Sequence, residues 1–523
     1  MSHRARKVAI AEAILEQKLS FYLRNPIDMP FLVLCSLNGS ATIVLPSTES
    51  PMEPQSTTEQ DVRTSDELRD AEPRPVWWDG AHTGPQTQPL RGRINADLVV
   101  VGGGYTGLWA AIEALTAHPG RRVVVLEQSW VGAAASGRNG GFVSESLTHG
   151  IAHGEAMWPD ELDELQRQGR QNVKEIADIL QRHEVDADLR LVGKTTLART
   201  PHEVEALRNA ATSHAHRGED VEFLDCDQVR ADIHSASFRG GLRIRSGGLV
   251  DPMALVLGLR RIAEKLGAVV FEQSPATGIT RTGGNLTVRS THGEVDTSHV
   301  VLASNAYPPL LRRLKSWILP VYDYVLATAP LSAAQVDSIG WTQNQGLTDA
   351  GNQFHYFRRT REDRIVWGGY DAIYHYGNAV GPELELRDRS HRLLARHFRE
   401  TFPQLADVPF THRWGGVIDT TSRFTPIFGT AFNGRLAYAV GFTGLGVAST
   451  RYGARVALDL LTGRDTERTS LRAITSSAVP FPPEPLRWSA VEITRAALAR
   501  EDETGRRGML LRTMDRFGVG FNS

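Results

Sequence analysis

Residues 97–107 read Asp97-Leu-Val-Val-Val-Gly-Gly-Gly-Tyr-Thr-Gly107, and a stretch of helical composition follows over 108–116. The apolar run predicts a buried strand, and the glycines predict a tight turn into a helix. In the pattern G-x-G-x-x-G, Gly102 permits the turn, Gly104 lets backbone approach a pyrophosphate, and Gly107 lets helix and strand pack closely. The stretch therefore predicts a Rossmann-like dinucleotide-binding fold of the α/β class.

A second apolar strand, 122–127, ends in Glu127, where a carboxylate can accept hydrogen bonds from ribose hydroxyls and disfavours a 2′-phosphate. The small-residue loop Val131-Gly-Ala-Ala-Ala-Ser-Gly-Arg-Asn-Gly-Gly141 follows directly. Its Ser136, Arg138 and Asn139 offer hydroxyl, cationic and amide groups to phosphate, ribitol or a flavin edge, and its glycines allow close approach. This loop favours FAD over NAD, with a flexible surface loop as the alternative interpretation.

These two glycine-rich segments, 102–107 and 135–141, resemble the D-amino-acid oxidase superfamily, which includes glycine and sarcosine oxidases. Within it they look most like the gamma-glutamylputrescine oxidase branch. Segments 247–252, 300–307 and 437–446 are also similar to that family, so the resemblance spans roughly residues 90 to 475. In the family, the helix after the last of these segments faces the flavin pyrimidine, where its positive end would stabilise the reduced flavin.

The motif and the resemblance together imply a set of cofactor-binding residues. They are Gly102, Gly104, Tyr105, Thr106, Gly107, Glu127, Gln128, Ser136, Arg138, Asn139, Gly140, Gly141, Ala276, Ser304, Asn305, Thr443, Gly444, Leu445 and Gly446. Relatives with covalent flavin carry a histidine just past the second strand or a cysteine in the C-terminal part. This chain has Arg138 and Asn139 in the first region and no cysteine after Cys226. The resemblance therefore implies noncovalent FAD.

The family's organisation implies two domains. An FAD-binding domain is expected from residues 90–165, 240–320 and 412–475. A second, α+β substrate domain with a mixed or antiparallel sheet is expected from 166–239, of charged-helical pattern, and 321–411, which reads as strands. An N-terminal extension, 1–89, is expected to be largely disordered, and 476–523 is expected to be a helical tail that docks on the fold or on a second subunit, as in a homodimer.

Aromatic residues are concentrated in the second half of the predicted substrate domain. Such side chains suit an amine or ammonium substrate through cation–π contact, although packing inside a sheet is the alternative for each of them. The predicted catalytic residues are Tyr370, Trp367 and His355, together with Arg423, which falls where the family turns a loop beside the flavin; the alternative for Arg423 is a surface arginine. The segment 364–369 has no lysine of the kind that promotes reaction with oxygen in sarcosine-oxidase-like relatives, so oxidase and dehydrogenase both stay open.

The predicted reaction is hydride transfer from the carbon beside nitrogen in a small amine or amino acid to flavin N5, followed by hydrolysis of the imine. Oxygen or another acceptor, such as a quinone, would reoxidise the flavin. A flavin dehydrogenase of a hydroxy acid or polyol is the first alternative. A non-catalytic FAD-binding protein is the second.

The composition gives little further direction. The formal net charge of -2 offers no reason to expect nucleic acid, two distant cysteines favour a reducing, cytoplasmic setting, and no metal-ligand spacing occurs. A basic stretch, 4–24, precedes a short apolar run, 31–37, which is too short to span a membrane and lacks a convincing cleavage site. An alternative is that the natural protein starts at Met52.

Overall fold

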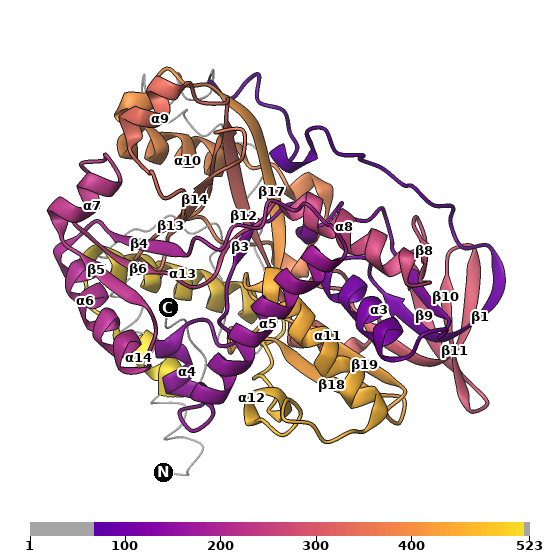
Figure 1. The fold of residues 1–523 in the computed structure, drawn as a ribbon. Coiled ribbons are helices and arrows are strands. Elements are labelled where there is room, and N and C mark those ends of the chain that lie inside the picture. Colours follow the sequence, from indigo (N-terminus) through magenta and orange to yellow (C-terminus); the bar gives the residue numbers. More distant parts are fainter. Residues whose placement is uncertain (1–66, 517–523) are drawn as a thin grey trace, which may run out of the picture. The chain divides into compact units, whose positions relative to one another are not determined.

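The computed structural model describes residues 67–516, which belong to one compact unit of the chain (Figure 1). The predictions made for residues 1–66, including the basic stretch and the apolar run, lie outside the described residues. Within 67–516, every helix is too short or too polar to cross a bilayer.

The first sheet has eight strands and contains the predicted nucleotide-binding strand. Its strands are β1 (Gly92–Val101), β2 (Val123–Leu126), β8 (Val269–Phe271), β9 (Ala276–Thr282), β10 (Asn285–Ser290), β11 (Gly293–Leu302), β18 (Ile427–Ala431) and β19 (Leu436–Val440). The order β18-β19-β11-β1-β2-β8 is parallel from β19 to β8, with β18 antiparallel at one end. The valines of β1 and β2 are buried, as expected for a parallel sheet covered on both faces.

Helix α3 (Tyr105–Ala117) packs beside this sheet, against α8 (Pro252–Lys265) on one side and α11 (Gly446–Thr462) on the other (Figure 1). The chain can turn from β1 into α3 because Gly102 has a φ of 108°, which a side chain would disfavour. The Asp251 side chain caps α8, which begins with a proline at its first position. These elements confirm the Rossmann-like prediction.

The second sheet has nine strands, and its mixed pairing agrees with the predicted fold class. They are β4 (Lys194–Ala198), β5 (Val221–Leu224), β6 (Gly240–Ile244), β12 (Leu319–Thr328), β13 (Gly346–Asp349), β14 (His355–Arg359), β15 (Ile365–Gly369), β16 (Ile373–Tyr374) and β17 (Phe410–Thr420). The order is β16-β12-β15-β14-β13-β4-β6-β5, and β17 pairs with β12. Strands β6 and β17 thus join this sheet, whereas the sequence boundaries placed both with the cofactor segments.

The stretch 166–239 contains more than the predicted helices, because β4 and β5 also lie in it. The other elements within residues 67–475 are β3 (Phe142–Val143), β7 (Gly248–Leu249), α4 (Ile151–Met157), α5 (Leu162–Arg182), α6 (Pro201–His216), α7 (Cys226–Asp232), α9 (Ala333–Ile339), α10 (Asp388–Thr401), α12 (Arg472–Thr475), η1 (Val76–Trp78), η2 (Ala135–Gly137), η3 (Arg312–Ser316), η4 (Tyr376–Asn378), η5 (Pro382–Leu384) and η6 (Pro403–Leu405). Helix α10 packs on one face of the second sheet, against β12 and β15.

Two terminal segments pack on the fold. Residues 67–89 belong to the predicted disordered extension, but they pack on the fold. Trp77 is buried, and its indole N–H donates to the backbone carbonyl oxygen of Asn139 at 2.9 Å. The predicted helical tail forms α13 (Leu486–Thr504) and α14 (Met509–Arg516). Its α13 docks on this same chain, because the Asp502 carboxylate accepts from the backbone N–H groups of Asn352 and Gln353, both at 2.8 Å.

Candidate active site

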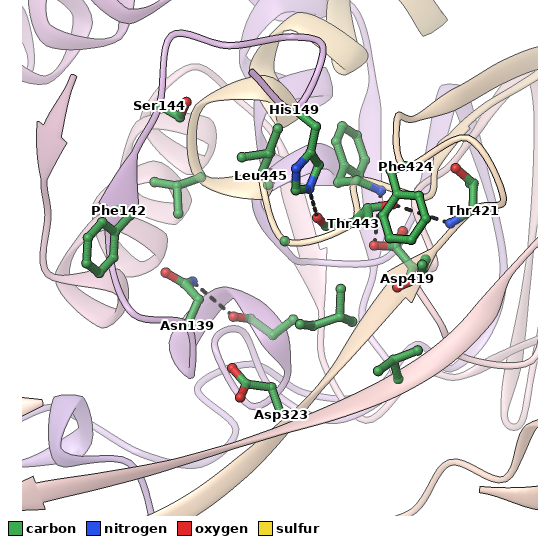
Figure 2. A pocket seen from close by; sticks show the side chains of 18 of the residues that line it. Asn139, Phe142, Ser144, His149, Asp323, Asp419, Thr421, Phe424, Thr443 and Leu445 are labelled. Atoms are coloured by element: carbon green, nitrogen blue, oxygen red, sulfur yellow. Dashed lines mark hydrogen bonds between the residues drawn. The ribbon is translucent and has the colours of Figure 1, made fainter. Parts of the chain in front are cut away.

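A cavity of about 1240 Å³ runs from the glycine turn of β1 to one face of the second sheet (Figure 2). The carboxyl ends of β1, β2 and β11 line it through Gly102, Glu127 and Ala303, and β12 lines it through Asp323. Ligands of open α/β sheets bind outside the carboxyl ends of the strands. The cavity therefore joins the place expected for a dinucleotide to the sheet expected to hold the substrate.

The glycine turn leaves no room for side chains. A Cβ on Gly102 would lie 2.4 Å from the Ala303 carbonyl oxygen, and one on Gly104 would lie 2.9 Å from the Ser136 hydroxyl oxygen. A Cβ on Gly107 would lie 1.9 Å from the Gly102 carbonyl oxygen, so this glycine allows α3 to pack on β1 as predicted. Among the predicted cofactor residues, Gly107 alone does not line the cavity.

Glu127 is held at the end of β2 by backbone donors. Its carboxylate accepts from the N–H of Gly103 at 2.8 Å and from the N–H of Ser129 at 2.9 Å. Burial raises the pKa of Glu127, although these bonds favour the ionised form. The side chain lines the cavity beside Gln128, at the position where a ribose hydroxyl was expected.

The loop 135–141 is fixed by its own polar side chains. The Asn139 amide donates to the Ala135 carbonyl oxygen at 3.0 Å and accepts from the Gly141 N–H at 2.9 Å. The Arg138 guanidinium binds the Glu385 carboxylate at 2.8 Å and lies over the Trp78 ring. Both residues line the cavity, but their polar groups also hold this loop in place.

The turn before α11 forms another wall of the cavity. Asp419 lies at its base, where its carboxylate accepts from the N–H groups of Gly441 and Phe442, and burial raises its pKa to about 7. Above the turn, the His149 ring is 2.8 Å from the Thr443 carbonyl oxygen, and burial lowers the pKa of this histidine to about 4 (Figure 2). Leu445, at the helix N-cap, has no side-chain capping bond.

These features fit FAD. Neither α3 nor α11 has a hydrogen bond from the side chain of its N-cap residue, and both begin at the cavity, so their positive dipole ends can face anionic or carbonyl oxygens. In α3 the first N–H, that of Tyr105, already donates to the Ser136 hydroxyl at 2.9 Å. The buried Ser304 hydroxyl lines the cavity and has no hydrogen-bond partner within 67–516. A long ligand with several polar groups would satisfy it.

Three carboxylates on strands of the second sheet line the cavity: Asp323 of β12, Asp349 of β13 and Asp419 of β17. Asp323 of β12 accepts from the Tyr356 hydroxyl at 2.6 Å and from the Gly369 N–H at 3.1 Å. Tyr356 belongs to β14, and its ring crosses β15 at Gly368, where a Cβ would lie 2.6 Å from the hydroxyl oxygen. Burial raises the pKa of Asp323 to about 6. The strand pairing thus builds a half-buried Asp–Tyr pair on the cavity face of the sheet.

The structure brings one of the four predicted catalytic residues into the cavity, which is Tyr370. His355 and Trp367 alternate with Tyr356 and Gly368 along their strands, so they lie on the opposite face of the sheet. The His355 ring binds the Asp349 carboxylate at 2.5 Å, and Trp367 is fully buried in the core beneath α10. These contacts correct the predicted direct role of both residues, and packing, the stated alternative, describes Trp367.

Arg423 is neither in the cavity nor on the surface, since it is 3% exposed. Its guanidinium donates to the backbone carbonyl oxygens of Ala473 and Ser476 at 3.0 and 2.8 Å. These bonds tie the loop before β18 to the segment after α11. The structure therefore corrects both interpretations of Arg423, a residue beside the flavin and a surface arginine. Arg423 instead holds two segments of the chain together.

Sequence reasoning missed three contributors to the cavity: Asp323, His149 and the C-terminal helices. Asp323 left a readable signal, because it is the one charged residue in the apolar strand Val321-Tyr-Asp-Tyr-Val-Leu-Ala327. His149 left none, since a lone histidine in a loop has no diagnostic spacing. Helices α13 and α14 line the cavity through residues such as Thr494 and Leu511, which composition alone could not place.

The fold and the site define a dinucleotide-binding enzyme of the α/β class with a separate substrate sheet. A model of the FAD dependent oxidoreductase (DAO) family matches residues 97–460. The chain belongs to this family and is an FAD-dependent oxidoreductase.

Individual relatives agree with the family match. The chain is 31% identical over 390 residues to gamma-glutamylputrescine oxidoreductase of Escherichia coli (strain K12), covering 72% of this chain and 86% of the relative. It is 29% identical over 408 residues to probable oxidoreductase OrdL of Haemophilus influenzae, covering 76% and 90%. Among solved structures, glycine oxidase from Geobacillus kaustophilus has the same fold, with a TM-score of 0.60 at 20% identity over 72% of this chain and 96% of that one.

Proposed function

We propose that the protein oxidises the C–N bond of a small amine or amino acid, with noncovalent FAD held along the glycine turns and the substrate held against the second sheet. The observation that carries this proposal is the half-buried, hydrogen-bonded Asp323–Tyr356 pair in the cavity. A relative named gamma-glutamylputrescine oxidoreductase supports the class of substrate.

Bound FAD would supply the acceptor for the hydride that leaves the carbon beside nitrogen. The cofactor would be held by the residues that line the cavity at the starts of α3 and α11, with Glu127 at the ribose. Neither Arg138 nor Asn139 provides a nucleophile for a covalent link, which supports noncovalent binding.

In this proposal Asp323 removes the proton from the substrate nitrogen. An amine reaches the protein mainly as the ammonium, and hydride can leave only after nitrogen has lost a proton and regained its lone pair. The ionised Asp323 carboxylate can bind the ammonium and accept that proton at Oδ1 or Oδ2. The Tyr356 hydroxyl fixes the orientation of the carboxylate by donating to Oδ2 at 2.6 Å. Water then adds to the iminium carbon, and the C–N bond breaks to give the carbonyl product and ammonia or an amine, with release of one proton.

The apolar part of the cavity excludes water around this carboxylate. Val321 and Val325 flank Asp323 on the same face of β12, and Phe142 packs edge-to-face on Tyr356 at a centroid distance of 5.8 Å. An ion pair gains strength in such an environment because the effective dielectric constant is low. The same environment would keep the iminium from premature hydrolysis.

The test is anaerobic mixing of the flavin-loaded protein with polyamines, gamma-glutamyl amines, N-methyl amino acids, D-amino acids and hydroxy acids. Amines should bleach the oxidised flavin band near about 450 nm, and hydroxy acids should not. Readmitting air then separates an oxidase, which recovers the band rapidly, from a dehydrogenase. Bleaching by hydroxy acids alone, or a purified protein that binds no flavin, would contradict the proposal.

A further inference from the structure

The cavity extends beyond the Asp323–Tyr356 pair along the same face of the second sheet. The register aligns Tyr356 with Thr348 of β13, Thr348 with Thr196 of β4, and Thr196 with Leu242 of β6. All four side chains line the cavity. These four side chains therefore line an arm of the cavity that leads along the sheet away from the Asp323–Tyr356 pair.

Lys194 projects into this arm. It lies two residues before Thr196 on β4, so it is on the same face of the sheet, and it lines the cavity. Within residues 67–516, Lys194 has no hydrogen-bond or ion-pair partner. The acid that attracts the Lys194 ammonium electrostatically is Glu219. The Glu219 carboxylate is already bonded to His214 at 2.6 Å and to Gln166 at 2.7 Å.

An ammonium in this position is costly for the protein. Burial lowers the pKa of Lys194, with only Glu219 opposing that effect. Lys194 is half-buried, and an ammonium that is partly removed from water is stabilised by an opposite charge. An anionic group in whatever occupies the arm would supply that charge.

The two charged groups are well separated along the sheet. Asp323 is on β12 and Lys194 is on β4, with β15, β14 and β13 between them. Four strand spacings put the two strands about 19 Å apart, and the side chains shorten the gap by reaching into the cavity. An α-amino acid, in which amine and carboxylate share one carbon, cannot reach both groups.

We propose that Lys194 binds a carboxylate at one end of an elongated substrate while Asp323 receives the amine at its other end. The substrate class is then an amine with a remote carboxylate, such as an ω-amino acid or a longer acyl-linked equivalent. This inference rests on the proposed amine oxidation for the role of Asp323, whereas the carboxylate site stands on Lys194 alone.

The first experiment measures binding without turnover. Calorimetric titration of the flavin-loaded protein with straight-chain monocarboxylates, which have no amine to oxidise, is compared for wild type, Lys194→Gln and Lys194→Arg. Loss of one charge-assisted hydrogen bond should weaken binding about tenfold or more in Lys194→Gln, and Lys194→Arg should retain most of it. Lys174→Gln is the matched control, because Lys174 is exposed on α5 and lies outside the cavity. Equal affinity in wild type and Lys194→Gln would overturn the inference.

The second experiment follows anaerobic flavin reduction by ω-amino acids of increasing length and by alkylamines of matching length. The wild type should have a lower KM for the carboxylated series, and Lys194→Gln should remove that advantage by raising the KM of the carboxylated amines more than that of the alkylamines. Equal losses for both series would assign Lys194 a structural role and overturn the inference. If carboxylate binding depends on Lys194 but no amine reduces the flavin, the carboxylate site stands and the proposed amine oxidation falls.

Discussion

The glycine turn after β1 and the cavity face of the second sheet hold the two halves of the site in different ways. The turn is built from neighbours in sequence, since Gly102, Gly104 and Gly107 lie in one short segment. The face is built by register, since Tyr356 must cross Gly368 of a neighbouring strand to reach Asp323. The proposed cofactor site is therefore encoded locally, and the proposed substrate site is encoded by strand pairing.

The largest effect on cofactor binding is expected from breaking the local half. In Gly107→Ala, the added Cβ would meet the Gly102 carbonyl oxygen at 1.9 Å and push α3 off β1. Overpacking of this kind costs about 1–3 kcal/mol, which corresponds to a fall in FAD affinity of about fivefold to a hundredfold. The flavin-to-protein ratio after dialysis measures it. Gly278→Ala on β9 is the control, because its Cβ has no atom within 4 Å; equal flavin content in both variants would refute the packing argument.

A change at Gly368 tests the half that depends on register. A Cβ there would occupy the position of the Tyr356 ring and separate its hydroxyl from Asp323. Gly368→Ala should retain FAD and reduce the anaerobic flavin reduction rate by about tenfold, equal to one lost hydrogen bond to a charged group. Tyr356→Phe should show a similar loss with the backbone unchanged. Full activity in both variants would show that the Tyr356–Asp323 bond is not needed.

The tail that closes the cavity should have a smaller effect. Asp502→Ala removes the bonds that hold α13 to Asn352 and Gln353. The wall should loosen, which raises KM about threefold to tenfold and leaves kcat within about twofold. Steady-state kinetics with an amine substrate measure both constants. Glu503→Ala, at the neighbouring exposed residue, serves as the control. A matching rise in KM in this variant would contradict the role of the Asp502 bonds in holding α13.

The smallest kinetic effect is expected on the opposite face of the same sheet. Trp367→Phe should lower the free energy of unfolding by about 1–2 kcal/mol, because buried volume is lost while an unsatisfied indole N–H is also removed. Denaturant unfolding measures that loss. The flavin reduction rate should stay within about twofold of wild type, and a large kinetic loss without loss of stability would restore the direct role first predicted for Trp367.

The sequence predicts the dinucleotide half well because its signals are contiguous. The valine run, the spaced glycines and Glu127 can be read without knowing which strands pair. The aromatic cluster of the second sheet could not be placed on a face in the same way. A shift of one residue separates His355 and Trp367 from Tyr356 and Gly368, and nothing in the local pattern decides which pair meets the cavity.

Two further contributions require the folded chain. Lys194 lies in a stretch whose charged-helical pattern gave no sign of β4. The sequence also could not show that Lys194 lacks a partner within the described part of the chain, because this depends on Glu219 binding His214 instead. Helices α13 and α14 lie beyond the family match, which ends at residue 460. Asp323 is different, because a single carboxylate inside an apolar strand is visible in the sequence and indicates a functional residue.

The central claim is that Asp323 takes the substrate proton in the cavity, and the pH dependence of anaerobic flavin reduction tests it most directly. Burial raises the pKa of Asp323 to about 6, and the ionised form is the active one. The wild-type value of kcat/KM should therefore rise with pH through about 6 and fall away below it. Asp323→Asn should reduce the rate by about 10²–10⁴ and remove that acid limb. An unchanged rate, or an acid limb that persists in Asp323→Asn, would contradict the account.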